Sequence, residues 1–265
     1  MDHLVIRDTF DRRASRYDGE DHWRQRLAER AVWFAALQAG SRVLDIATGT
    51  GFAALYAAEK VGPKGEVLGI DISSQMLAEA ERRRRELVIE NARFELRDGH
   101  DVASYGKRFD AILCVSAMAY FDDAATILKN WSSTVRAGGR IAFTALEEDA
   151  FVSSAVFSRH AAAAEVSVPD LTGPLSSEAR CLDVCKAAGL RKARVSVETL
   201  SATMGSIEAT WQLILDAAAG EAVRNLPAET LSVMRDQFAR EIATLVVDGQ
   251  VVERPRCEFI TAIVP

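Results

Sequence analysis

Residues 43–51 read Val-Leu-Asp-Ile-Ala-Thr-Gly-Thr-Gly, a short apolar run that ends in small residues. The apolar run predicts a strand over 42–47, and the small residues predict a tight turn into a helix over 51–60. Glycine lets the backbone approach a ligand closely, and the N-terminal end of a helix favours an anionic or polar group. This stretch therefore predicts a ligand-binding turn at the end of a strand.

Strands and helices alternate outward from this turn. Strands are expected at 66–71, 93–97, 109–115 and 140–144, with helices at 73–90 and 124–135 and a turn at 137–139. Strands that alternate with helices of about 10 to 15 residues indicate βαβ units and a parallel sheet. Two helices, 3–17 and 20–38, precede this core. Further helices are expected at 150–166, 177–188, 206–219 and 228–247, and the late strands 193–200 and 256–264 as an antiparallel pair that closes the sheet.

The composition is that of an ordinary globular chain. It has 265 residues, a net charge of −6, 49% hydrophobic and 26% charged residues, which excludes disordered, collagen-like and disulfide-scaffold classes. The acidic balance argues against a partner nucleic acid. We expect no membrane span and no secretory signal. The four scattered cysteines (Cys114, Cys181, Cys185 and Cys257) favour a reduced cytoplasmic protein, with Cys181 and Cys185 as helix thiols and no metal site.

Three carboxylates near the predicted strand ends point to a nucleoside ligand. Asp71 ends the second strand, where it can accept two hydrogen bonds from a ribose diol; the alternative is that it caps the next helix. Asp45 can order the turn or receive an ammonium group. Asp98 follows the third strand, within reach of an adenine edge.

The same turn also fits a dinucleotide fingerprint, Gly49-x-Gly51-x-x-Ala54, so a nicotinamide-dependent oxidoreductase stays an alternative. The pair Tyr56-x-x-x-Lys60 has the spacing of a short-chain dehydrogenase. It lies directly after the glycine turn, however, far from where that family places its catalytic pair.

Six segments together resemble the class I S-adenosylmethionine-dependent methyltransferases, in the branch that includes ubiquinone/menaquinone-biosynthesis and small-molecule methyltransferases. The segments are 10–18, 43–51, 69–77, 98–99, 109–115 and 135–143. The resemblance implies a Rossmann-like α/β fold, with a mostly parallel seven-stranded sheet, an antiparallel last strand, an N-terminal helical lid and inserted helices. We expect the lid over 1–40 and the methyltransferase domain over 41–265, with insertions at about 146–176 and 205–248.

The resemblance also implies a set of residues that bind S-adenosyl-L-methionine. Ala47, Gly49 and Gly51 would pass near the methionyl part, the Val115 carbonyl would receive its ammonium group, and Asp71 would hold the ribose. Ile72 and Met76 would flank the adenine, Asp98 and Gly99 would bond its edge, and Tyr17 would descend from the lid. Two positions depart from the family pattern: Ala47 stands where many relatives have Gly, and His100 where many have Glu or Gln.

The acceptor side is less patterned. His100, His22 and His160 are candidate general bases, and Met118, Tyr120 and Phe121 are candidates for the acceptor pocket. Arg82–Arg85 form a run of four arginines that Glu79, Glu81, Glu86 and Glu90 surround on a predicted helix, which indicates a solvated, salt-bridged face. We expect methylation of a small apolar or aromatic molecule, on oxygen first and on carbon or nitrogen as alternatives. A non-methylating reaction such as cyclisation, or a binding role, stays open, as does the choice between monomer and homodimer.

Overall fold

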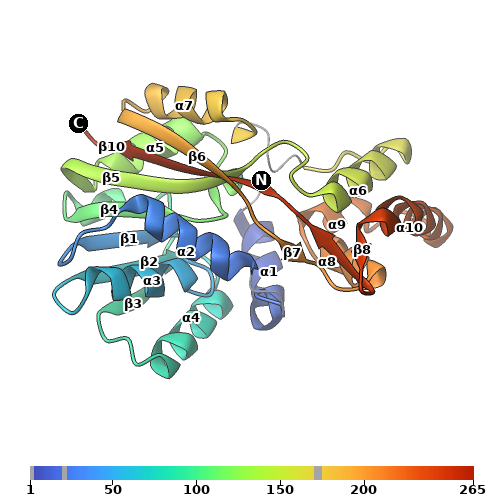
Figure 1. Ribbon diagram of the computed structural model, residues 1–265, viewed down its shortest axis with the longest axis horizontal. Helices are drawn as coiled ribbons and strands as arrows, with labels where there is room; N and C mark the ends of the chain where they lie inside the picture. The colour runs from blue at the N-terminus through green and yellow to red at the C-terminus, as the bar shows by residue number, and fades with distance from the viewer. Residues whose placement is uncertain (1–2, 20–22, 170–174) are drawn as a thin grey trace.

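The computed structural model describes residues 3–19, 23–169 and 175–265. Within them, seven strands form one sheet in the order β3-β2-β1-β4-β5-β10-β6 (Figure 1). The strands are β1 Arg42–Ile46, β2 Glu66–Asp71, β3 Ala92–Leu96, β4 Phe109–Cys114, β5 Val135–Leu146, β6 Arg191–Thr199 and β10 Arg256–Ile263. Strands β1 to β5 pair in parallel, and β10 runs antiparallel to both of its neighbours. The predicted fold is confirmed, including the late antiparallel pair.

Helices cover both faces of the sheet. On one side lie α2 Trp23–Ala35 and α3 Phe52–Val61, and on the other lie α5 Ala124–Ser132 and α7 Glu178–Ala187 (Figure 1). Helix α4, Ser74–Glu86, packs against β2 and β3. Neighbouring residues of β1 point to opposite sides, since Val43 belongs to the core under α3 and Leu44 to the core under α5. Such two-sided burial explains why β1 is almost continuously apolar.

The remaining elements form a group with its own apolar core. This group contains α6 Val152–Ala163, α8 Ile207–Leu215, α9 Ala218–Val223 and α10 Ala228–Ile242, with the short strands β7 Ala202–Thr203, β8 Val246–Val247 and β9 Gln250–Glu253. Phe157, Trp211 and Phe238 are the large side chains at its centre. Figure 1 shows this helical group beyond one end of the sheet. We find no helix in the described ranges with the length and hydrophobicity needed to cross a membrane.

Several boundaries differ from those predicted. The helix expected at 206–219 is divided into α8 and α9, and the helix expected at 73–90 ends at Glu86. The helix expected to reach residue 247 ends at Ile242 and is followed by a 3₁₀ turn over Ala243–Leu245; the positive φ angles of Asp248 and Gly249, 50° and 78°, then turn β8 into β9. The turn expected at 137–139 lies inside β5. There the Gly138 N–H donates to the Val264 carbonyl, and the Val264 N–H donates to Gly139, both at 2.9 Å.

The first helix of the lid, α1 His3–Arg13, continues into a 3₁₀ turn over Ala14–Arg16 and packs against α4. Asp11 of α1 fixes this contact. Its Oδ1 accepts the Ser73 hydroxyl at 2.5 Å and the Gln75 N–H at 3.2 Å. The lid is therefore attached to the start of the helix that follows β2.

Gly51 combines a positive φ with a close neighbour, which makes its substitution informative. Its φ is 88°, and an added Cβ would lie 2.9 Å from the Ala80 Cβ. Gly40 has a φ of 80° with no atom within 4 Å. We expect Gly40→Ala to lower the free energy of unfolding by about 1 kcal/mol, from backbone strain alone, and Gly51→Ala to lower it clearly further. Urea denaturation of both variants measures the difference, and equal losses would contradict the packing argument.

Candidate functional site

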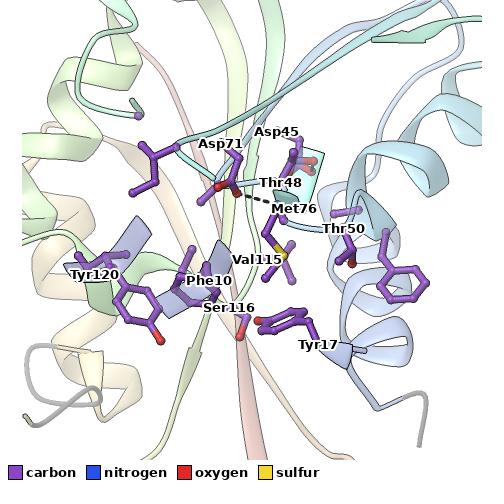
Figure 2. Close-up of a pocket in the computed structure, with 18 of the residues that line it drawn as sticks. Phe10, Tyr17, Asp45, Thr48, Thr50, Asp71, Met76, Val115, Ser116 and Tyr120 are labelled. Carbon is purple, nitrogen blue, oxygen red and sulfur yellow. Dashed lines mark hydrogen bonds between the residues drawn. The ribbon is translucent and has the colours of Figure 1, made fainter. Parts of the chain in front are cut away.

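A cavity lies under the lid, at the carboxyl ends of β1, β2 and β4 (Figure 2). Most of the residues predicted from the sequence line it: Tyr17, Asp45, Ala47, Gly49, Asp71, Ile72, Met76, Asp98, Gly99, His100, Val115, Tyr120 and Phe121. Two predicted residues lie elsewhere. Gly51 packs against Ala80 and Phe94, and Met118 is buried in the core under α5, which leaves its predicted place in the acceptor pocket without support.

The turn after β1 brings backbone to the cavity wall. Ala47 and Gly49 have positive φ angles of 54° and 55°, and the Thr48 N–H donates to the Ile70 carbonyl at 2.9 Å. The left-handed conformation is unfavourable for alanine, so Ala47 carries strain that a glycine would not. Such local strain is common at ligand-binding turns.

Asp71 ends β2 and orders two loops at once. Its Oδ2 accepts the Gly49 N–H at 2.8 Å, and its Oδ1 accepts the Ser73 N–H at 2.9 Å. Burial raises the pKa of Asp71, and these backbone hydrogen bonds oppose the rise. The helix cap is Ser73, whose hydroxyl accepts the Met76 N–H at 3.1 Å, so Asp71 is not the cap of α4. Each carboxylate oxygen retains capacity for a further donor.

Asp45 is the most unusual group of the site. It is 1% exposed, and its Oδ2 accepts the Thr48 hydroxyl at 2.6 Å, whereas its Oδ1 has no hydrogen-bond partner among the described residues. Burial raises the pKa of Asp45 to about 7; the nearby charge of Asp71 adds to the rise, and the Thr48 hydroxyl and the Ala54 backbone oppose it. An unpartnered buried oxygen of this kind fits a ligand that brings a donor or a positive charge.

Asp98 joins two histidines at the edge of the cavity. Its Oδ1 lies 2.7 Å from His100 Nδ1, and its Oδ2 lies 2.9 Å from His3 Nδ1 of the lid. Burial would raise the pKa of Asp98, but its hydrogen bonds and the charges of His100 and His3 lower it. Both oxygens are thus already engaged, so contact with an adenine edge requires a shared oxygen or a shift of His3. The His100 ring packs 5.1 Å from the ring of Phe121.

Aromatic rings gather at the other end of the cavity. Phe10 lies edge-on to Tyr17 and to Tyr120, with ring centroids 5.8 and 5.3 Å apart. Figure 2 shows these three residues together, across the cavity from Asp45 and Asp71. Burial raises the pKa of Tyr120 to about 12. Tyr120 is therefore a neutral phenol near pH 7, a donor of hydrogen bonds rather than a base.

Arg83 is a site residue that the sequence analysis missed. Its Nη2 donates to Asp18 Oδ2 and its Nη1 to the Thr50 carbonyl, both at 2.5 Å, while the Thr50 hydroxyl donates to Asp18 at 2.8 Å. The end of the lid is thereby fixed to the turn after β1. Arg82, Arg84 and Arg85 form the expected salt-bridged face, but the interpretation was wrong for Arg83. Its spacing from the buried Met76 and Ala80 was the available signal.

The other candidate bases lie away from the cavity or cannot be placed. His160 Nε2 is 2.7 Å from Glu241 Oε1 in the helical group. His22 lies outside the described residues. Among the described histidines, His3 and His100 line the cavity, and the role of His100 as a base stays a prediction.

Comparisons with known proteins agree with this geometry. Residues 37–180 match the model of a family described as "Methyltransferase domain". An aklanonic acid methyltransferase of Streptomyces is 33% identical over 141 residues, which span 52% of this chain and 64% of that relative. A nocamycin O-methyltransferase of Saccharothrix syringae is 29% identical over 83% of this chain and 90% of its own length. The crystal structure of a SAM dependent methyltransferase from Aquifex aeolicus superposes with a TM-score of 0.56 at 15% identity, covering 96% of this chain and 98% of that one.

The raised pKa of Asp45 predicts how stability depends on pH. Because the folded state holds this proton more tightly than the unfolded chain, whose pKa is near 3.8, the contribution of Asp45 to stability falls as pH rises from about 4 to about 7. The loss reaches at most about 1.4 kcal/mol per pH unit. Asp45→Asn abolishes this titration. The wild-type free energy of unfolding should therefore decline relative to that of Asp45→Asn across this window, and parallel curves would contradict the assignment.

Proposed function

The chain belongs to the class I S-adenosylmethionine-dependent methyltransferases, and we propose that it methylates a small apolar or aromatic molecule, on oxygen in the first instance. One observation carries the proposal. The unpartnered oxygen of Asp45 and the diol-binding position of Asp71 lie at one end of a cavity whose other end is aromatic. A polar cofactor end and an apolar acceptor end are what such a transfer requires.

The residues present fit S-adenosylmethionine. The raised pKa and free oxygen of Asp45 suit a positively charged ammonium group, which would draw the carboxyl to its ionised form. Each oxygen of Asp71 already accepts one backbone N–H, and each can accept a ribose hydroxyl as well. Gly99 supports the adenine role, since an added Cβ would lie 2.7 Å from Ile46 and 3.0 Å from Phe121, so the backbone passes close to both.

When bound, S-adenosylmethionine supplies a methyl group on a positively charged sulfonium. The chain must then hold an acceptor atom in line with that group and exclude water, and such positioning alone can lower a barrier by about 7–11 kcal/mol. Phe10, Tyr17 and Tyr120 provide the walls for this purpose. The neutral Tyr120 can orient the acceptor as a donor. The acceptor must then arrive ionised, or lose its proton to solvent or to His100.

Small-molecule acceptors are supported by the relatives. Those reported above are named for aklanonic acid and, as an O-methyltransferase, for nocamycin. The matching family is a methyltransferase domain, which favours methyl transfer over the nicotinamide-dependent oxidoreductase and over cyclisation. We further propose a cytoplasmic protein, because its four cysteines are buried free thiols. Either a monomer or a homodimer is compatible with this function.

The cofactor assignment predicts a defect in Asp71→Ala. Loss of the diol acceptor should weaken the affinity for S-adenosylhomocysteine about tenfold or more, measured by calorimetric titration with NADH as the parallel ligand. Asp110→Ala is the matched control, since Asp110 also accepts a backbone N–H, that of Arg42 at 2.8 Å, but lies at the start of β4. Unchanged affinity in Asp71→Ala would refute the diol role. Binding of NADH in place of the homocysteine derivative would refute the cofactor.

Methyl transfer itself is tested with labelled cofactor. We expect the protein to transfer a radioactive methyl group to members of a panel of phenols, aromatic carboxylic acids and matched aryl amines, with the oxygen acceptors preferred. Asp71→Ala should lower kcat/KM at limiting cofactor. The protein could instead bind the cofactor, and be stabilised against unfolding by S-adenosylhomocysteine, yet transfer no methyl group to any acceptor of the panel. That result would favour the non-methylating or binding alternatives.

A further inference from the structure

Two arginines beside the aromatic end of the cavity differ from their neighbours, because neither has an acidic partner among the described residues. Arg24 lines the cavity, whereas Arg13 lies outside its lining. On the same lid segment, Arg12 pairs with Glu221 and Arg16 pairs with Asp216, each at 2.8 Å. Arg13 and Arg24 form no ion pair or side-chain hydrogen bond with any part of the chain that the structure describes. Their contacts are with aromatic rings instead.

Arg13 is buried as well as unpaired. It is 8% exposed, and burial lowers the pKa of its guanidinium, with Tyr17 opposing and the charge of Arg24 adding to the decrease. Arginine nevertheless stays protonated near neutral pH. A buried charge without a counter-ion is unfavourable, and such groups are therefore candidates for functional sites. The charge of Asp216 acts on the Arg13 guanidinium, but the Asp216 carboxylate is already paired with Arg16.

The two guanidinium groups both lie near one side chain. The Arg13 Cζ lies 5.5 Å and the Arg24 Cζ lies 4.6 Å from the centre of the Tyr17 ring. Tyr17 and Arg24 both line the cavity, and Figure 2 shows Tyr17 beside Phe10 and Tyr120. Two positive charges thus stand at an aromatic wall, on the side of the cavity away from Asp45 and Asp71.

We propose that Arg24, with the positive charge of Arg13 nearby, binds a carboxylate of the acceptor, so that the preferred acceptors are aromatic carboxylates. This inference rests on the proposed function and narrows its substrate class. The planar guanidinium matches a carboxylate in a bidentate geometry, and the rings of Phe10, Tyr17 and Tyr120 accommodate a flat apolar body. A monoanion also suits this apolar wall better than a dianion such as a phosphate monoester. Moving a charge from water to the wall is unfavourable, and a second charge adds to that desolvation cost. The carboxylate supplies the counter-ion that Arg13 lacks.

The test uses two probes of matched shape, 2-naphthoate and 2-naphthamide. Each is titrated calorimetrically into the full chain saturated with S-adenosylhomocysteine. We expect 2-naphthoate to bind roughly tenfold to a hundredfold more tightly than the amide. Arg24→Gln should remove most of that preference and Arg13→Gln a smaller part of it, while the amide affinity changes little. Arg12→Gln, which alters an exposed and paired lid arginine, should keep the preference.

Thermal unfolding separates a binding role from a structural one. If the charge of Arg13 serves ligand binding and does not stabilise the ligand-free protein, Arg13→Gln should leave the melting temperature of that protein unchanged or raise it. Equal binding of naphthoate and naphthamide by the wild type would overturn the proposal, as would a preference that survives in both variants. Retained binding of S-adenosylhomocysteine in those cases leaves the proposed function standing. Failure of the wild type to bind it would instead refute the proposed function, and this inference with it.

Discussion

Two carboxylates, Asp45 and Asp71, are buried at the carboxyl ends of adjacent parallel strands. The site depends on the unequal number of hydrogen bonds that the chain donates to them. Asp71 receives backbone N–H groups on both oxygens, whereas Asp45 receives one hydroxyl and keeps one oxygen free. The repulsion between them contributes to the raised pKa of Asp45. The turn after β1 follows from the same arrangement, because its Gly49 N–H is one of the donors to Asp71. The site therefore has one carboxylate, Asp71, that fixes two loops, and one, Asp45, with an oxygen that can accept a donor from a ligand.

The lid is held by polar contacts to this same region. Asp18 bonds Thr50 and Arg83, and Asp11 bonds the first turn of α4. His3 reaches Asp98 beyond β3. Each of these contacts ends on a loop or helix that forms the cofactor end of the cavity. A ligand bound there would therefore touch the same loops that hold the N-terminal segment in place.

The sequence was sufficient for the sheet and for most of the cofactor end, because those features depend on local patterns. Buried strands read as apolar runs, and the turn residues lie next to the strands that position them. It was insufficient where a role depends on contacts distant in sequence. In the sequence Arg83 is one member of a charged run, and its hydrogen bond to Asp18, 65 residues away, is visible only in the structure. Met118 was placed by adjacency to Tyr120, but the 3₁₀ turn over Met118–Tyr120 directs the two side chains to different places. The absence of a partner for Arg13 and Arg24 within the described ranges is likewise visible only in the structure.

The helical group beyond the sheet is built around its own apolar core, with Phe157, Trp211 and Phe238 at its centre. None of these three side chains lines the cavity that carries the cofactor residues. All the residues that line the cavity lie at or before Phe121, so altered helix lengths or insertions in the helical group can leave the cavity wall intact. The chain thus folds around separate apolar cores, and a change in the packing of one need not displace the glycine turn or its carboxylates.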